Sequence, residues 1–370
     1  MVNIYSELFL VLLWVAFVAI LGKKVLYPKP ETVLGKEEMR YSKGFAFLAV
    51  LPLMFWAANR SWNYGDTGSY IMKFWSMPDS LSGISEYLDT IGKDKGFYFF
   101  SCLIKCFITQ DRIVYFFIIA FVQLLSITKL FRKYSSDYVF SLCLFVISTD
   151  YVIWMFNGMR QFLAVSITLF ALPLILRKKY IPALLIILFA SIFHQSSLIM
   201  VPLIFLLQGK AWSIRTMLII LGIIFAIMFV GQFTSLLDSS LSETQYKNVV
   251  TDYTSGGDDG TNPLRVAVYS IPTIIAFIGR KKHQKCDDVL IYFCTNASII
   301  STGLYALSMF TSGMYLGRIP IYLSLYNYIL LPWEIKNIIP EKSRSVITVG
   351  IIVLYLVFYY YQFHIAWSFM

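Results

Sequence analysis

Residues 217–230, MLIILGIIFAIMFV, form an unbroken apolar run without a charged or amide side chain. Comparable runs recur along the chain, at residues 8–21, 184–193 and 346–361. Of the 370 residues, 58% are hydrophobic and only 14% carry a charge, which is too apolar for a soluble domain. Because long apolar runs recur from end to end of so apolar a chain, the sequence predicts an all-α polytopic membrane protein, with residues 1–370 forming one integral membrane domain.

The distribution of basic residues explains the net charge of +10 without a nucleic-acid partner. The strongest basic clusters lie between apolar runs, at residues 23–24, 132–133, 177–179, 280–282 and 336–344. The positive-inside rule places such clusters in the cytoplasm. The two long polar segments, residues 60–96 and 234–262, are then the first and second external loops.

These landmarks predict about twelve crossings with both termini outside, and a GT-C-like arrangement is one candidate for the fold. The expected spans are residues 6–22, 44–58, 112–131, 138–156, 158–176, 180–193, 196–208, 215–233, 264–279, 288–311, 315–332 and 345–363. Residues 97–108 are too short to span comfortably and carry Lys105, so we expect a re-entrant or interfacial helix there. A polar break at residues 193–197 separates two short helices, and membrane-depth breaks are tolerated where they line a cavity or are buried in protein.

Three arginines lie just inside apolar segments near the predicted external face: Arg160, Arg265 and Arg318. A cationic side chain in a membrane segment is costly enough that function is the default interpretation, although each arginine could instead anchor its helix end at the interface. Arg160 follows Asn157, which is expected to cap a helix that opens an anion site.

The other two arginines have similar surroundings. Asn262 and Pro263 provide a cap and a first helical residue ahead of Arg265. Arg318 lies between Gly317 and Pro320, with Tyr322 one turn further along. Together with Gln161, Asn157, Arg265 and Arg318, Tyr322 is a candidate substrate-binding residue.

Arg60, Asp66 and His194 fall at the same predicted depth, and Arg60 is a further candidate substrate-binding residue. Asp66 could take a proton from a sugar hydroxyl, or it could pair with Arg60. His194 could transfer a proton, donate a hydrogen bond to phosphate, or bond to Ser196 or Ser197.

Aromatic residues accompany these polar groups in the first external loop. Trp62 and Tyr64 could stack on sugar faces, or they could belong to an interfacial aromatic belt. The pair Asp258-Asp259 is a weak metal signal, and a solvated loop that closes over substrate is the stronger interpretation. The sequence indicates no cofactor and no disulfide framework.

Several of these segments resemble the EpsG family of polysaccharide polymerases, which are related in role to Wzy-type O-antigen and capsule polymerases. The similarity is carried by Arg60, Asp66-Thr67 and Tyr70, by Gly96-Phe97-Tyr98, and by residues 157–164 (NGMRQFLA) and 190–197 (ASIFHQSS). It implies a bacterial inner-membrane enzyme, independent of metal, that joins glycan repeat units carried on undecaprenyl diphosphate. It also implies that external arginines engage the diphosphate. That role falls on Arg160, with Arg265 and Arg318 as helpers.

The mechanism expected from this resemblance is an inverting displacement at the anomeric carbon, with Asp66 or His194 as the base. A chain-length regulator protein is a candidate partner besides the lipid bilayer and the lipid-linked glycans. Two alternatives stay open: a flippase or exporter of lipid-linked oligosaccharides, and a GT-C glycosyltransferase that uses polyprenyl monophosphate sugars. A transporter is disfavoured because the charges are predicted on one face.

Overall fold

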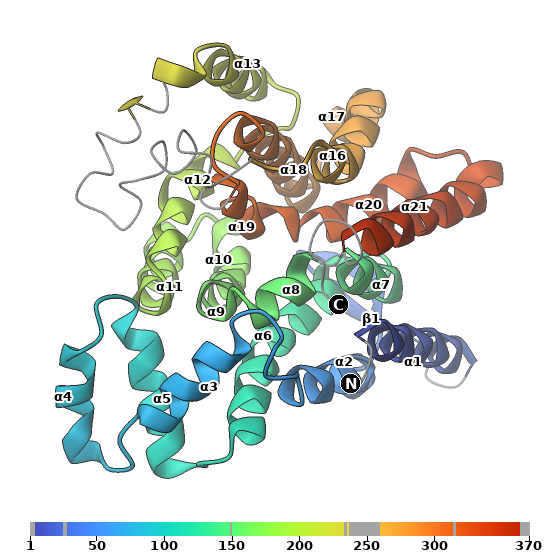
Figure 1. Cartoon of the computed structure of the whole chain (residues 1–370). Helices are drawn as coiled ribbons and strands as arrows, with labels where there is room; N and C mark the ends of the chain where they lie inside the picture. The colour runs from blue at the N-terminus through green and yellow to red at the C-terminus, as the bar shows by residue number, and fades with distance from the viewer. Residues whose placement is uncertain are drawn as a thin grey trace. The chain divides into compact units, whose positions relative to one another are not determined.

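The computed structural model describes residues 4–24, 28–148, 150–232, 235–236, 260–313 and 316–362. The chain divides into two compact units, the first being Met1–Val201 with Gln362–Met370 and the second Pro202–Tyr361. Both are built from helices, and the described residues contain one two-stranded sheet (Figure 1). The expectation of an all-α membrane protein is therefore confirmed at that level.

The first unit begins with a long helix, a hairpin and a second helix. Its elements up to the long helix α6 are α1 (Ile4–Lys24), β1 (Lys29–Val33), β2 (Lys36–Arg40), α2 (Lys43–Ala58), α3 (Thr67–Ser76), η1 (Leu81–Gly83), α4 (Ile84–Asp89), α5 (Lys95–Phe107) and α6 (Arg112–Tyr134). The elements that follow are α7 (Tyr138–Ile147), α8 (Asp150–Phe156), α9 (Met159–Thr168), η2 (Leu169–Ala171), α10 (Leu172–Leu176), α11 (Tyr180–Phe193) and η3 (Gln195–Ile199).

The chain passes into the second unit within α12 (Met200–Leu206). The remaining described elements are α13 (Ile214–Met228), α16 (Pro263–Ile278), α17 (Arg280–Lys285), α18 (Val289–Ser308), η4 (Leu316–Arg318), α19 (Ile321–Ser324), α20 (Asn327–Asn337) and α21 (Glu341–Tyr361). Within this unit α18 packs against α13, α16, α19 and α20, and its side chains are buried along most of its length.

Four helical segments of the described residues are long and apolar enough to cross a membrane, namely α6, Met159–Leu176, α18 and α21. A fifth is added if α7 and α8 count as one span, although they meet at an angle of 66°. Shorter apolar helices such as α2 and α16 fall below spanning length. The membrane class is thus supported, while the predicted twelve crossings stay a prediction.

The predicted break near His194 is confirmed. Helix α11 ends at Phe193, His194 has an extended backbone, and the chain resumes as η3 and α12. A short helix, α5, also covers the segment expected to be re-entrant or interfacial. Its Lys105 is buried, and the contacts of its amino group make this burial tolerable. The amino group donates to the carbonyl oxygens of Trp75 and Met77, at the C-terminal end of α3, and pairs with Asp79 at 3.0 Å.

Two predicted continuous spans are wrong in detail. Residues 138–156 bend between α7 and α8. Residues 315–332 are divided into η4, α19 and α20, because Pro320 forms the N-cap of α19 and a new helix starts at Asn327. Proline lacks the N–H that a continuous helix requires at that point.

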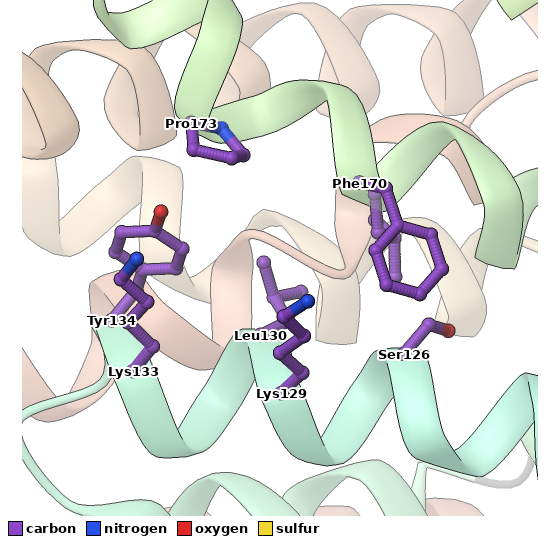
Figure 2. Close-up of a pocket in the computed structure, with 8 residues that line it drawn as sticks. Ser126, Lys129, Leu130, Lys133, Tyr134, Phe170 and Pro173 are labelled. Atoms are coloured by element: carbon purple, nitrogen blue, oxygen red, sulfur yellow. The ribbon is translucent and has the colours of Figure 1, made fainter. Parts of the chain in front are cut away.

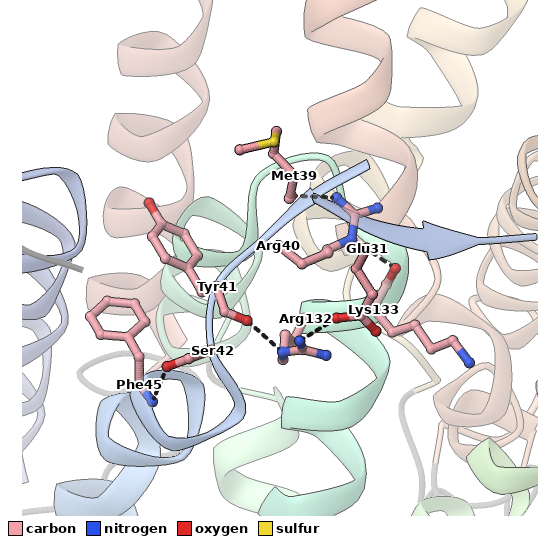
Figure 3. A network of polar contacts seen from close by, with 8 residues as sticks. All are labelled: Glu31, Met39, Arg40, Tyr41, Ser42, Phe45, Arg132 and Lys133. Carbon is pink, nitrogen blue, oxygen red and sulfur yellow. Dashed lines mark hydrogen bonds and ion pairs between the residues drawn. The ribbon is translucent and has the colours of Figure 1, made fainter. Parts of the chain in front are cut away.

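The hairpin of β1 and β2 was not predicted, since its sequence is charged and has no apolar run. It lies at the C-terminal end of α6, where Arg132 pairs with Glu31 and donates to the carbonyl oxygen of Tyr41 (Figure 3). Arg40 Nε donates to the carbonyl oxygen of Lys133 at 3.0 Å. Hydrogen bonds and an ion pair with the hairpin segment, which is distant in sequence, therefore hold the basic C-terminal end of α6 in place.

Helix α9 lies at the centre of the first unit and packs against α6, α8 and α11. Every residue of α9 except Arg160 is buried, which makes it a rigid support. Helices α3 and α5 pack against each other through an apolar cluster that includes Tyr70, Phe97 and Tyr98. Together these elements position the polar groups described next.

Candidate functional site

Arg160, the second residue of α9, lies in a polar cluster of the first unit. Its Nη1 donates to Asp94 Oδ2 at 2.7 Å, and its guanidinium carbon lies 5.8 Å from the centre of the Tyr98 ring. The Arg160 guanidinium also donates toward the hydroxyl oxygen of Tyr70. The Arg160 side chain is 21% exposed whereas that of Asp94 is fully buried, so an external anion would meet the arginine first.

Asp94 is the main site residue that the sequence analysis missed. It precedes α5 with a left-handed backbone, at φ 57°, and its carboxylate turns inward to Arg160. Burial raises the pKa of Asp94, while Arg160 and Lys93 act in the opposite direction. The feature that could have revealed it in the sequence is the position of this acidic residue just before the Gly96-Phe97-Tyr98 motif. The lysines on either side of it made the segment resemble a solvated loop.

His194 is connected to α9 through Ser196. The Nδ1 atom of His194 lies 2.7 Å from Ser196 Oγ and accepts a hydrogen bond from the Ser196 backbone N–H at 3.3 Å. Gln161 Nε2 donates to the same hydroxyl oxygen at 3.2 Å. Because Nδ1 is an acceptor here, neutral His194 carries its proton on Nε2, which is a donor. The backbone N–H of the neighbouring Gln195 acts to lower the pKa of Asp94, so this segment influences the Asp94 carboxylate as well.

Asn157 does not cap α9 as predicted. The N-cap is Gly158, which has no side chain, and the backbone N–H of Asn157 still bonds to α8. The Asn157 side chain turns instead to the first external loop and accepts a hydrogen bond from the Asp66 backbone N–H at 3.2 Å. Asn157 thus positions Asp66, whose exposed carboxylate makes no capping bond to α3.

Two exposed aromatic rings accompany the segment around Asp66, and one of them, Trp62, lies against Gly68 in the first turn of α3. The rings of Trp62 and Trp75 are 5.6 Å apart, and the two side chains are 40% and 53% exposed. Lys73, on the same helix as Trp75, donates to the Tyr98 hydroxyl at 3.1 Å. A second cation therefore lies next to the aromatic ring that contacts Arg160.

Arg60 and Tyr64 lie inside the first unit, not at its surface. The Arg60 guanidinium is 3.8 Å from the Phe116 ring centre and donates to the Met155 carbonyl oxygen at 2.9 Å. Tyr64 is buried against Phe156. The sequence analysis considered an ion pair between Arg60 and Asp66; the structure describes both residues, and they do not form it. Their predicted substrate contacts stay predictions, while their geometry favours a supporting role.

The second unit holds the other two arginines. Asn262 caps α16 as predicted, accepting from the Leu264 N–H at 2.9 Å, with Pro263 at the first helical position. Arg265 is half-buried over Tyr305, with 5.3 Å from its guanidinium carbon to the ring centre. Arg318 is exposed at the end of η4.

The segments that carry these two arginines meet at the C-terminal end of α18. Thr261 donates from its N–H to the Ser308 carbonyl oxygen at 2.9 Å, and Gly317 fits against the Thr261 side chain. Tyr322, predicted to bind substrate, is fully buried in α19. Convergence of Arg160 with Arg265 and Arg318 would join the two units and stays a prediction. Asp258-Asp259 and most of the second external loop lie outside the described residues.

The sequence profile of the EpsG family matches residues 43–368, nearly the whole chain. The chain belongs to the EpsG family. No curated protein and no solved structure matches it. The EpsG match includes the Arg160 cluster, the break at His194 and both remaining arginines, and it supports a general polymerase-type role in polysaccharide synthesis at a membrane.

EpsG membership does not by itself say which side chains act. The geometry brings Arg160, Gln161, His194, Asn157 and Asp66 together in one unit, although the hydrogen bond between Asp66 and Asn157 alone spans 91 residues of the chain. A partly exposed guanidinium, a hydrogen-bond donor and an exposed carboxylate suit binding of an anion beside a proton-transfer step.

Proposed function

We propose that this EpsG-family protein is a glycosyltransferase that joins oligosaccharide repeat units carried on undecaprenyl diphosphate. The reaction takes place at the external face of the bacterial inner membrane. The observation that carries the proposal is Arg160, the only residue of buried helix α9 whose charged side chain reaches the surface among aromatic and hydroxyl groups. Such a fixed cation suits a diphosphate group that must be held at one point.

Arg160 stabilises the leaving group. In the transfer step the bond between the anomeric carbon and the diphosphate oxygen breaks, and the electron pair stays on undecaprenyl diphosphate. A guanidinium already held by Asp94 and Tyr70 needs little reorganisation to meet this growing charge. Its planar fork can bind two phosphate oxygens at once.

Asp66 is the better candidate for the base, and His194 for a donor to phosphate. The acceptor hydroxyl attacks the anomeric carbon, forms the new glycosidic bond and loses its proton to Asp66, so a single displacement inverts the configuration. Asp66 is exposed and held through its backbone by Asn157. The Nδ1 atom of His194 is already occupied by Ser196, so Nε2 is the ring nitrogen that can donate to a phosphate oxygen.

Trp62 and Trp75 provide a surface for sugar rings. Aromatic faces stack on the apolar faces of pyranosides, and this pair is exposed on the loop and the helix that flank Asp66 in the sequence. Arg265 and Arg318 assist by contacting the same diphosphate or that of the second lipid-linked substrate. Tyr322, buried in α19, supports the Arg318 segment.

The direct test is polymerisation by purified protein. Synthetic undecaprenyl-diphosphate oligosaccharide is supplied without other enzymes, and product length is read by gel. We expect a ladder from the wild type, and a loss of turnover on the order of 100-fold or more from Arg160→Lys, because lysine lacks the fork. Arg112→Lys is the matched control, since Arg112 also starts an apolar helix but contacts none of these groups.

Other outcomes identify the competing functions. Movement of labelled lipid across vesicles without any lengthening of the glycan would show a flippase and refute the polymerase. Lengthening only with a polyprenyl monophosphate sugar would show the alternative glycosyltransferase. Full turnover in Arg160→Lys would remove the assigned role of that residue.

A further inference from the structure

A cavity with lysine and apolar side chains in its lining lies in the first unit, at the opposite end of α6 from Asp111. It has a volume of about 60 Å³ and lies between the last two turns of α6 and the segment η2–α10. Figure 2 shows Lys129, Lys133 and Tyr134 directed from α6 toward Phe170 and Pro173 across this space. The volume is enough for about four water molecules, which is close to the size of one phosphate group.

Two lysines on one face of α6 line the cavity. Lys129 and Lys133 are four residues apart, so their amino groups repel each other unless an anion lies between or near them. Neither forms an ion pair with a carboxylate in the described ranges, whereas Arg132 is paired with Glu31. The lysine amino groups instead lie over aromatic rings, Lys129 at 5.0 Å from the centre of Phe170.

Tyr134 gives an independent indication of a ligand. Its side chain is only 7% exposed and lines the cavity, yet its hydroxyl has no hydrogen-bond partner in the part of the chain that the structure describes. A buried hydroxyl without a partner is unfavourable, and an anion oxygen in the cavity would satisfy it. Ser126 does not compete, because its hydroxyl donates to the Gln123 carbonyl oxygen at 2.7 Å.

A simpler interpretation is that the lysines only compensate the dipole at the C-terminal end of α6. That interpretation explains their position along the helix. It does not explain a cavity between them and η2–α10, or a buried hydroxyl without a partner on a tyrosine that lines this cavity. The lining contains no acidic residue, and its remaining walls are the apolar side chains of Leu130, Leu169 and Pro173.

We propose that this cavity binds the phosphate group of an anionic amphiphile, with Lys129 and Lys133 contacting the phosphate oxygens and Tyr134 donating a hydrogen bond. Basic pockets between membrane helices commonly bind anionic headgroups in this way. The apolar walls favour a phospholipid as the source, and soluble phosphate is the other source of the same chemistry. The site is separate from the Arg160 cluster, so it does not rest on the proposed polymerase function.

The test measures ligand binding by the purified full-length protein in detergent. Thermal unfolding is followed during titration with phosphatidylglycerol, with phosphatidylcholine and with inorganic phosphate. Three proteins are compared with the wild type: Lys129→Gln with Lys133→Gln, Tyr134→Phe, and Lys281→Gln with Lys285→Gln. The last pair is the matched control, because these exposed lysines are also four residues apart on a basic helix.

We expect phosphatidylglycerol, but not phosphatidylcholine, to raise the unfolding temperature of the wild type. The double substitution in the cavity should weaken this binding by about 10-fold or more, and Tyr134→Phe by about fivefold. If only inorganic phosphate binds and the cavity variants abolish it, the phosphate site is confirmed with a soluble source. Unchanged affinity in the cavity variants, or an equal loss in the control pair, would overturn the proposal.

Discussion

Asn157 and Gly65 form a close approach between the first external loop and the segment that joins α8 to α9. Gly65 has a left-handed backbone, at φ 49°, and a Cβ atom built there would lie 1.5 Å from Asn157 Oδ1. Only glycine leaves room for the Asn157 side chain to accept from the Asp66 N–H. The position of the proposed base, Asp66, therefore depends on the lack of a side chain at Gly65.

Gly65→Ala tests this dependence. The substitution adds both backbone strain and an overlap with Asn157, so we expect a loss of about 1–3 kcal/mol in the free energy of unfolding. Glycan lengthening should fall as well, because Asp66 moves. Unfolding temperature and product ladders are the measurements. Gly92→Ala is the control, since its Cβ meets nothing within 4 Å; equal behaviour of the two variants would contradict the argument.

A buried histidine and glutamate form a second residue-level feature, in the second unit. His283 Nε2 lies 3.5 Å from Glu334 Oε1, and both side chains are fully buried. Burial lowers the pKa of His283 from 6.5 to about 4 and raises that of Glu334 well above 4.5. The Thr295 hydroxyl donates to the Ile291 carbonyl oxygen, so it accepts from His283 Nδ1, and Nε2 is left as an acceptor facing Glu334.

The two shifts should offset each other in the pH dependence of stability, in a window that begins near pH 4.5. While Glu334 is protonated in the folded chain and the histidine is protonated in the unfolded chain, each state holds one proton, so proton binding does not change on unfolding. Where the unfolded histidine has lost its proton and Glu334 keeps its own, stability falls as pH rises. Below about pH 4.5 the unfolded glutamate gains a proton and stability falls again.

Single substitutions should expose opposite slopes within the window. Glu334→Gln leaves His283, whose depressed pKa makes stability fall as pH drops from 6.5 toward 4. His283→Gln leaves Glu334, whose raised pKa makes stability fall as pH rises above 4.5. Where the folded and unfolded chains differ by one bound proton, stability changes by about 1.4 kcal/mol for each pH unit. Unfolding temperature against pH is the measurement, and two flat profiles would refute the shared proton.

At the scale of elements, apolar runs that begin at a capping residue are the features best predicted from sequence. Helix α6, expected from residue 112, starts directly after Asp111, whose carboxylate accepts from the N–H groups of Ile113 and Val114. The hairpin and α3 were not predicted. The hairpin sequence is charged, and α3 is a short amphipathic helix inside a segment expected to be a loop. The hairpin is held by Arg132 and Lys133, about a hundred residues away. Local patterning cannot report such contacts.

The packing of α5 on α11 depends on Gly96. A Cβ atom there would lie 2.6 Å from the Ile192 carbonyl oxygen, so the two helices could not keep their separation. We expect Gly96→Ala to destabilise the protein by about 1–3 kcal/mol, despite the higher helix propensity of alanine. Gly222→Ala, in open space on α13, should be neutral or slightly stabilising. Thermal unfolding distinguishes the two, and a neutral Gly96→Ala would show that α5 is not in close contact with α11.

At the scale of the whole molecule, part of the site could be predicted and part could not. The sequence analysis predicted Arg160 and His194 as site residues because a charge or a histidine at the start or the break of an apolar helix is unusual. Asp94 was missed because its partner is 66 residues away and nothing local shows that its carboxylate is buried. Contacts between distant segments decide which charges are functional.

A double-mutant cycle tests whether the arginines of the two units act on one ligand. Arg160→Lys and Arg318→Lys should each slow polymerisation on the order of 100-fold if both bind the diphosphate. When two residues act on the same group, the second substitution removes little that the first has not already removed. The double variant should therefore lose far less than the product of the two single effects, which would be on the order of 10,000-fold.

The comparison pair for this cycle is Arg160→Lys with Arg112→Lys, where the effects should multiply because Arg112 contacts none of the site residues. Turnover of purified variants with the same lipid-linked oligosaccharide gives all the rates. If the losses from Arg160→Lys and Arg318→Lys multiply fully, the two guanidiniums serve separate events. The diphosphate would then be bound by the first unit alone, with Arg160, His194 and Lys73 as its cationic and hydrogen-bonding groups.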